Sequence, residues 1–224
     1  MTLLAFDTAS TACSAAVLDG ARILAQKFQA MERGQAEALV PMIGDVLTRA
    51  GLAVENLDII AVTTGPGAFT GVRIGLAAAR GLALARAIPC VGVTTFEAVA
   101  FPAAVELRPG ETLVSVIESK RAELFLQAFD ATLHPVGEAF AQTPEAAAAR
   151  LPPGPLLLAG DGALRLLDSL ASRARLSSSR APNAAAFAPF AARRFADGQR
   201  AGMLRPFYMR PPDAKPMLEP AADG

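Results

Sequence analysis

Histidine and cysteine are scarce in this chain of 224 residues, which contains one histidine, His134, and two cysteines, Cys13 and Cys90. A zinc finger or a histidine-cluster metal site needs about four such ligands, so we expect no metal site built by this chain alone. His134 precedes Pro135 in a predicted turn, where a lone imidazole is more often a surface group than a base. A Ser-His-Asp or Cys-His nucleophile is therefore not expected, and no catalytic residue is assigned.

An excess of charge of one sign is also missing, because Lys plus Arg number 21 and Asp plus Glu number 21. Bulk charge alone therefore does not hold this chain to nucleic acid or anionic lipid. No apolar stretch reaches the roughly 20 residues of a membrane helix, since the longest, 75–88, is interrupted by Arg80 and Arg86. The apolar run at 2–6 is too short for a signal peptide and ends at Asp7. We expect a cytoplasmic protein without a membrane segment.

Apolar residues are abundant, at 52% with a mean hydropathy of +0.35, and provide ample material for a core. The first half predicts strands over 2–6, 13–18, 22–28, 57–63 and 91–93, and helices over 35–49, 72–87 and 96–101. The second half repeats this order more weakly, with strands over 113–117, 123–129, 133–140 and 156–159, and helices over 143–150, 163–173 and 183–197. This order predicts an α/β fold of mixed sheets flanked by helices. Two lobes, 1–105 and 106–224, would enclose a cleft, and the proline-rich tail after Arg205 is expected to be extended.

Asp7 ends the first predicted strand and is followed by Thr8 in a turn of small polar residues. A carboxylate beside hydroxyls at a strand end can position a metal-bound phosphate. An Asx turn that satisfies the local backbone explains the same residues, and spacing alone favours it.

A glycine loop at 65–71 joins a predicted strand to a predicted helix. Backbone N–H groups at a helix start favour an anion, and Arg73 adds a cation. The loop is not a P-loop, because no Lys-Ser/Thr pair follows, nor G-x-G-x-x-G, because Thr70 occupies the sixth position. A tight turn that lets the helix pack close to the sheet is equally consistent. The residues of this candidate nucleotide cleft are Asp7, Thr8, Gly65, Gly67, Thr70, Gly71 and Arg73.

Three further features each allow two interpretations. The small-residue stripe of the helix 72–87 lets another helix approach, and a neighbour in the same chain explains it more simply than a partner chain. The Gly-Asp-Gly sequence at 160–162 can approach a ligand in the second lobe or merely connect a strand to a helix. The arginine-rich stretch 163–210 can face RNA, but an ordinary solvated surface is favoured.

Six segments together resemble one family. They include DTA from Asp7, PMI at 41–43, GPGAFTGVRIG at 65–75, GLA at 81–83, GVTT at 92–95 and PFYMR at 206–210. These segments resemble the TsaB (YeaZ) family of bacterial tRNA threonylcarbamoyladenosine biosynthesis proteins, strongly to about residue 100 and more loosely after it. The resemblance implies the two-lobed actin-like ATPase fold (ASKHA, with ribonuclease H-like lobes).

The family is related to TsaD, the subunit that transfers threonylcarbamoyl to adenosine 37 of tRNA. TsaD holds its metal with a His-x-x-x-His pair, which a chain with one histidine cannot supply. The resemblance therefore implies a non-catalytic partner of TsaD with no cofactor of its own. It implies that TsaE joins the assembly, that tRNA is contacted indirectly and that the chain alone forms a homodimer. Whether ATP or ADP binds at a shared interface in the complex stays open. The implied interface is on the first-lobe helices, at Leu39, Met42, Ile43, Gly71, Gly75, Ala79, Leu82 and Arg86.

Two departures from the family pattern concern nucleotide or metal chemistry. Gln35 stands where many members have a histidine, and Glu118-Ser119-Lys120 stands where members often have Asp-Ala-Arg. The alternative function is a stand-alone ASKHA ATP-binding enzyme or an M22-like peptidase. A peptidase needs a metal or a nucleophile–base pair, and the sequence offers neither. A phosphotransferase needs a complete phosphate-binding site, and only Asp7 and the glycine loop could contribute to one.

Overall fold

The first of two sheets is built from the N-terminal part of the chain. The structure, a computed structural model, describes residues 1–199 and 204–210. The strands of this sheet lie in the order β3-β2-β1-β4-β5, and β1 pairs antiparallel with β2 and parallel with β4, so the sheet is mixed. Its strands are β1 (Thr2–Asp7), β2 (Ala12–Asp19), β3 (Arg22–Ala30), β4 (Ile59–Thr63) and β5 (Cys90–Val93).

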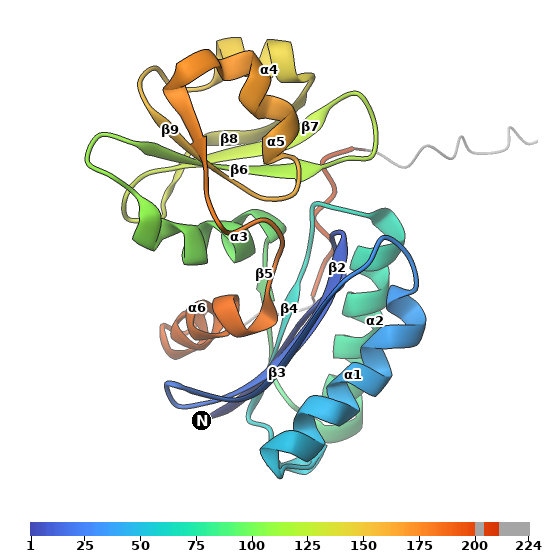
Figure 1. The fold of residues 1–224 in the computed structure, drawn as a ribbon. Helices are drawn as coiled ribbons and strands as arrows, with labels where there is room; N and C mark the ends of the chain where they lie inside the picture. Colours follow the sequence, from blue (N-terminus) through green and yellow to red (C-terminus); the bar gives the residue numbers. More distant parts are fainter. Residues whose placement is uncertain (200–203, 211–224) are drawn as a thin grey trace, which may run out of the picture.

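The second sheet repeats this topology, in the order β10-β9-β6-β7-β8. Again the central strand, β6, pairs antiparallel with its successor β7 and parallel with β9. Figure 1 shows the two sheets one above the other, each with its own helices. The strands are β6 (Thr112–Glu118), β7 (Leu124–Phe129), β8 (Pro135–Gln142), β9 (Leu156–Ala159) and β10 (Ala174–Leu176).

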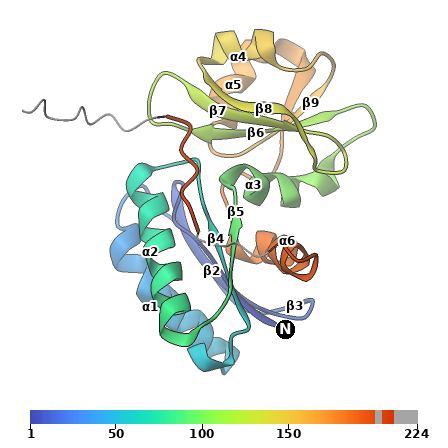
Figure 2. The same cartoon turned by 180° about the vertical axis from the view of Figure 1, so that it is seen from behind.

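Helices cover both faces of the first sheet. Helices α1 and α2 lie side by side on one face and α6 on the other (Figures 1 and 2), while α4 and α5 cover the outer face of the second sheet. Helix α3 lies between the two sheets and packs against the second. The α-helices are α1 (Gln35–Ala50), α2 (Phe69–Arg86), α3 (Thr95–Ala103), α4 (Pro144–Arg150), α5 (Ala163–Leu167) and α6 (Ala184–Ala196), and the short 3₁₀ helices are η1 (Val54–Asn56), η2 (Ala104–Glu106) and η3 (Asp168–Arg173).

Strand β1 illustrates why the central strands are continuous apolar runs. Successive side chains of a strand point to opposite faces. Leu4 and Phe6 pack with α1 and α2, whereas Leu3 and Ala5 pack with α6. Because both faces are covered, every position of the strand favours an apolar residue.

Helix α3 begins with a capping box that also ties it to α6. The Glu97 N–H donates to the Thr94 hydroxyl at 3.1 Å, and the Thr94 N–H donates to the Glu97 carboxylate at 2.8 Å. The same carboxylate forms an ion pair with Arg194 of α6. The last helix is thereby fixed to an element that packs against the second sheet.

The structure confirms the predicted fold class, with two mixed sheets flanked by helices. Helix α2 begins at Phe69 rather than at 72, the predicted helix 163–173 divides into α5 and η3, and β10 was not predicted. Helix α6 lies in the range 106–224 that was assigned to the second lobe, but it packs on the first sheet. The hydrophobic core at this sheet therefore contains residues from both assigned ranges. The end of the predicted extended tail, 211–224, lies outside the described residues. Over residues 1–199 and 204–210, no helix has the length and apolar character needed to span a membrane.

Candidate functional site

Asp7, the last residue of β1, is fully buried. Its Oδ1 accepts hydrogen bonds from the Thr63 hydroxyl at 2.5 Å and the Ala9 N–H at 3.1 Å, and its Oδ2 accepts from the Ser10 hydroxyl at 3.5 Å. The bond from the amide two residues later is an Asx turn. The carboxylate is therefore satisfied by protein donors, as the turn interpretation of this segment expects.

The two lobes touch next to Asp7. The Thr11 hydroxyl donates to Asp161 Oδ2 at 3.4 Å, and the Glu118 N–H donates to Asp161 Oδ1 at 2.8 Å. Burial, with a smaller contribution from the charge of Asp161, raises the pKa of Asp7 to about 7, although the hydrogen bonds from Thr63 and Ala9 lower it. Burial also raises the pKa of Asp161. Because the Asp7 side chain has no exposed surface, a ligand in solvent has no access to its carboxylate.

The glycine loop packs against the turn between β1 and β2. The Ala68 N–H donates to the Ala9 carbonyl at 2.8 Å, and the Thr8 hydroxyl donates to the Gly71 carbonyl at 2.8 Å. A Cβ on Gly67 would lie 2.1 Å from the Ala9 carbonyl oxygen, and one on Gly71 would lie 2.0 Å from that of Thr8. Only glycine allows backbones this close. Of the two interpretations of the loop, the one in which it packs closely against its neighbours explains why glycine stands at both positions.

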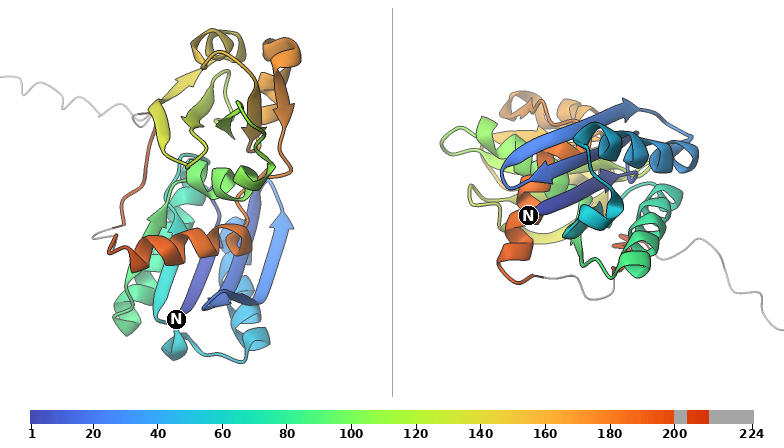
Figure 3. Two further views of the ribbon diagram at one scale, coloured as in Figure 1. Left: turned by 90° about the vertical axis from the view of Figure 1, so that its left-hand side faces the viewer. Right: turned by 90° about the horizontal axis from the view of Figure 1, so that it is seen from below.

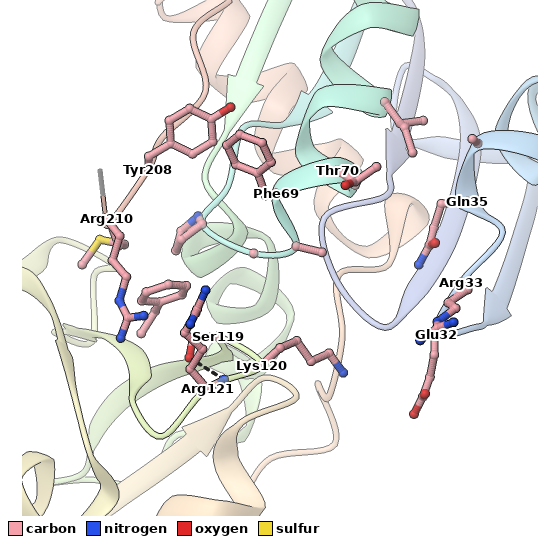
Figure 4. Close-up of a pocket in the computed structure, with 18 of the residues that line it drawn as sticks. Glu32, Arg33, Gln35, Phe69, Thr70, Ser119, Lys120, Arg121, Tyr208 and Arg210 are labelled. Atoms are coloured by element: carbon pink, nitrogen blue, oxygen red, sulfur yellow. Dashed lines mark hydrogen bonds between the residues drawn. The ribbon is translucent and has the colours of Figure 1, made fainter. Parts of the chain in front are cut away.

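A cleft of about 980 Å³ opens on the other side of the loop, opposite the turn that joins β6 to β7 (Figure 4). Helix α2 starts at this cleft, with no side-chain cap and no acidic residue in its first turn, a terminus that favours negative charge. The Thr70 side chain borders the same opening. Charged lining residues are Glu32, Arg33, Glu37, Lys120, Arg121 and Arg210, and apolar ones include Pro66, Ile74, Phe125, Phe207 and Met209.

Lys120 is one of the charged cleft residues that were not among the expected site residues. It adopts a left-handed backbone conformation with φ of 61°, and its side chain extends across the opening in Figure 4. Its ammonium has no hydrogen-bond or ion-pair partner in the part of the chain that the structure describes. The available signal is the change from an acidic to a basic residue between Glu118 and Lys120, in the segment between two predicted strands.

Arg73 does not face the cleft as a free cation. Its guanidinium carbon lies 3.7 Å from the centroid of the Phe69 ring, and its Nε donates to the Tyr208 hydroxyl at 2.9 Å. The Phe69 and Tyr208 rings stack at 5.3 Å. These contacts commit Arg73 to holding the C-terminal segment, a role that the sequence did not indicate.

Most residues of the expected partner interface are buried within the fold of this chain. Gly75 faces the sheet, where an added Cβ would meet the Thr8 hydroxyl at 2.8 Å and Val62 at 3.2 Å. Only Leu82, which is partly buried, and Arg86, which is exposed and paired with Glu55, have surface available. The buried members are Leu39, Met42, Ile43, Gly71, Gly75 and Ala79. The stripe of small residues therefore serves the packing of α2 on its own sheet.

Other positions on the same two helices are exposed. Val40 of α1 is 67% exposed and Leu84 of α2 is 89% exposed. Gly44 and Gly81 face open space, since an added Cβ at either would meet nothing within 4 Å. The exposed surface of α1 and α2 therefore includes two large apolar side chains and two glycines, Val40, Gly44, Gly81 and Leu84, here called the outward face of α1 and α2.

The arginines of the stretch 163–210 are largely engaged within the chain. Arg175 forms two hydrogen bonds to Glu111 at 2.7 Å, Arg165 bonds Glu118 at 2.6 Å, and Arg173 bonds the Pro152 and Ala148 carbonyls. The guanidinium groups of Arg165 and Arg175 are thus paired with carboxylates, and that of Arg173 is bound by backbone carbonyls. These contacts agree with an ordinary protein surface.

The remaining candidate residues make local structural contacts. His134 is exposed in the turn before β8, where its Nδ1 and the Thr132 hydroxyl share a hydrogen bond of 2.8 Å. Gly160 packs close to Val116, whose carbonyl oxygen would lie 2.2 Å from an added Cβ. Among residues 1–199 and 204–210, no three His, Cys, Asp or Glu side chains are grouped so as to hold a metal ion.

Sequence comparison relates the chain to tRNA modification proteins. A sequence model of the TsaD family, described as tRNA N6-adenosine threonylcarbamoyltransferase, matches residues 23–183. The tRNA threonylcarbamoyladenosine biosynthesis protein TsaB of Escherichia coli is 41% identical over 95 residues, which cover 42% of this chain and 41% of that protein. The chain thus spans less than half the length of this relative. An uncharacterized protein of Mycobacterium tuberculosis is 34% identical over 96% of this chain and 95% of its own length.

Solved structures agree with this relationship. YeaZ from Pseudomonas aeruginosa has a TM-score of 0.80 and 30% identity, and the match covers 92% of this chain and 99% of that one. Component A of the (R)-2-hydroxyglutaryl-CoA dehydratase of Acidaminococcus fermentans has a TM-score of 0.53 and 11% identity, and the match covers 88% of this chain and 99% of that one. The second likeness concerns the fold alone, which is the two-lobed actin-like ATPase fold.

Proposed function

The chain belongs to the TsaB (YeaZ) family, and we propose that it acts as a non-catalytic subunit in the synthesis of threonylcarbamoyladenosine at position 37 of tRNA. Its partner is TsaD, which it binds and keeps in an active form. The names of the related proteins support the pathway. The outward face of α1 and α2 supports the role of a binding subunit.

That exposed face is the observation that carries the proposal. Val40 and Leu84 are large apolar side chains left in solvent, beside glycines that add no bulk. Contiguous exposed apolar surface marks protein–protein interaction sites, and in our proposal these residues belong to such a surface. In our proposal TsaD covers this face, and a second copy of the chain covers it when TsaD is absent.

The burial of Asp7 supports the non-catalytic part of the proposal. A phosphotransferase of this fold class needs a carboxylate that a metal-bound phosphate can reach. Here the Asp7 side chain has no exposed surface, and its oxygens accept bonds from Thr63, Ala9 and Ser10. ATP or ADP would accordingly bind at an interface shared with TsaD, where TsaE joins and tRNA is held by the other subunits.

Size-exclusion chromatography with light scattering, alone and with TsaD of the same organism, tests the proposal. We expect a one-to-one complex to replace a homodimer. Leu84→Asp should abolish the complex because it places an unpaired charge in a desolvated contact. The matched control is Val105→Asp, which changes an equally exposed residue, 90% against 89%, away from this face. A complex that forms equally well with Leu84→Asp would overturn the assigned interface.

Nucleotide turnover by the isolated chain tests the non-catalytic role separately. We expect no hydrolysis of Mg-ATP by the chain alone and nucleotide binding only in the presence of TsaD. Turnover that disappears in Asp7→Asn would instead identify the chain as an ATP-binding enzyme of its own.

A further inference from the structure

The C-terminal segment 204–210, here called the clamp segment, starts in the core of the first lobe. Leu204 is buried with the residues that α1 and α2 cover, and its carbonyl accepts a hydrogen bond from Arg80. Three residues further on, the Phe207 N–H donates to the Thr64 carbonyl at 2.7 Å. The start of the segment is therefore fixed to α2 and to the end of β4.

The middle of the clamp segment is held at the start of α2. Tyr208 stacks on Phe69 and accepts a hydrogen bond from Arg73, whose guanidinium lies over the Phe69 ring. Stacking, hydrogen bonding and the cation–π contact act on the same three side chains and reinforce one another. The first lobe thus has a built anchor for this segment.

The end of the clamp segment reaches the second lobe. Met209 packs against the hydrophobic cluster between α3 and the second sheet. Arg210 forms an ion pair with Glu123, just before β7, and both side chains are about one-third exposed. The chain therefore crosses from the glycine loop to the β6–β7 turn over seven residues.

Two covalent connections join the lobes: β5 leads through α3 and η2 to β6, and residues 177–183 lead from β10 to α6. In the left view of Figure 3, the clamp segment follows one edge and the link from β10 to α6, residues 177–183, follows the other. Covalent connections permit the lobes to rotate relative to each other, and a non-covalent link at the edge opposite residues 177–183 limits that rotation. The clamp segment also lines the cleft, through Phe207, Tyr208, Met209 and Arg210.

We propose that the clamp segment fixes the angle between the two lobes and so sets the width of the cleft between the glycine loop and the β6–β7 turn. Its first-lobe anchor is the Phe69–Arg73–Tyr208 cluster, and its second-lobe anchor is the Arg210–Glu123 pair. Release of either anchor lets the second lobe rotate away from the first and opens the cleft. This is a property of the chain alone and is independent of TsaD binding.

Distance measurement between two spin labels tests the clamp. Labels at Thr48→Cys in α1 and Glu145→Cys in α4 occupy exposed sites at opposite ends of the molecule. Cys13 and Cys90 are buried, and burial raises the pKa of both thiols, so they react slowly. We expect Arg210→Glu to shift the distance distribution and broaden it, because two negative charges then face each other.

A charge swap and two matched variants complete the test. The double variant Arg210→Glu with Glu123→Arg should restore the original distribution. Tyr208→Phe, which removes only the hydroxyl that Arg73 bonds, should broaden it in part. Arg165→Glu is the control, because it breaks an ion pair with Glu118 that lies within the second lobe. A distribution unchanged by Arg210→Glu, or changed equally by Arg165→Glu, would overturn the clamp.

Discussion

Thr8 and Gly71 are in direct contact across the base of the cleft. The Thr8 hydroxyl donates to the Gly71 carbonyl at 2.8 Å, and a Cβ on Gly71 would lie 2.0 Å from the Thr8 carbonyl oxygen. Two residues that the sequence suggests as phosphate ligands thus bind each other. This contact lets α2 start close to β1 and leaves the glycine loop without free space on that side.

Replacement of Gly71 by alanine tests this packing. We expect Gly71→Ala to lower the free energy of unfolding by about 1–3 kcal/mol, because the added methyl overlaps a backbone oxygen. Gly81→Ala, in the same helix but facing open space, should raise it by about 1 kcal/mol, since alanine is the better helix former. Urea unfolding of the two variants measures both values. A stabilised Gly71→Ala would show that the loop has room to move.

Substitution of Asp7 tests the effect of its burial on pH dependence. Since the pKa of Asp7 is raised from 3.8 to about 7 in the folded chain, the folded state retains a proton that the unfolded state has released. The contribution of this group to stability is therefore present below pH 4 and is lost as pH rises toward 7. Asp7→Asn removes the charge, so its stability relative to the parent should be higher at pH 8 than at pH 5.

Asp45→Asn is the control for this pH effect. Asp45 is partly exposed, and its hydrogen bond with Lys27 lowers its pKa from the ordinary value of 3.8. Its contribution to stability is therefore lost only below about pH 4, and the relative stability of Asp45→Asn should stay constant from pH 5 to pH 8. Thermal unfolding from pH 5 to pH 8 measures both variants. An Asp7→Asn variant whose relative stability did not change with pH would show that Asp7 remains ionised in the folded chain.

Glu97 links α3 to α6 and is expected to matter for stability. Glu97→Ala removes both the capping box with Thr94 and the ion pair with Arg194, so we expect a loss of about 1–3 kcal/mol. Glu55→Ala breaks the Arg86 pair, which is about half exposed, and should cost less than about 1 kcal/mol. Equal effects in denaturant unfolding would mean that α3 and α6 are held by apolar packing alone.

Local pattern was sufficient to predict most of the fold. The apolar runs of β1 and β4 and the helical spacing of Leu39, Met42 and Ile43 indicate buried elements, and the structure buries them. Strand β10 was missed because its three residues carry no strand pattern and owe their conformation to parallel pairing with β9. Helix α2 begins early because its start is fixed by contacts with Thr8 and Ala9 rather than by a capping residue.

The candidate site was less predictable, because its contacts join residues far apart in the chain. The stripe of Gly71, Gly75 and Ala79 has the same spacing whether a sheet or a partner chain approaches it, and only the fold identifies the sheet. Likewise, nothing local to Arg73 indicates that Tyr208 binds it. The residues with outward surface, Val40 and Leu84, differ from the core-facing ones by a position or two along each helix.

The most direct test of the central claim is the amount of threonylcarbamoyladenosine in tRNA from cells whose only copy of this gene carries a single substitution. We predict that Asp7→Asn retains the modification, whereas Leu84→Asp loses it and Val105→Asp does not. That result would locate the function in the outward face of α1 and α2. Loss of the modification in Asp7→Asn with the TsaD complex intact would contradict the account and assign the chain a nucleotide-dependent role.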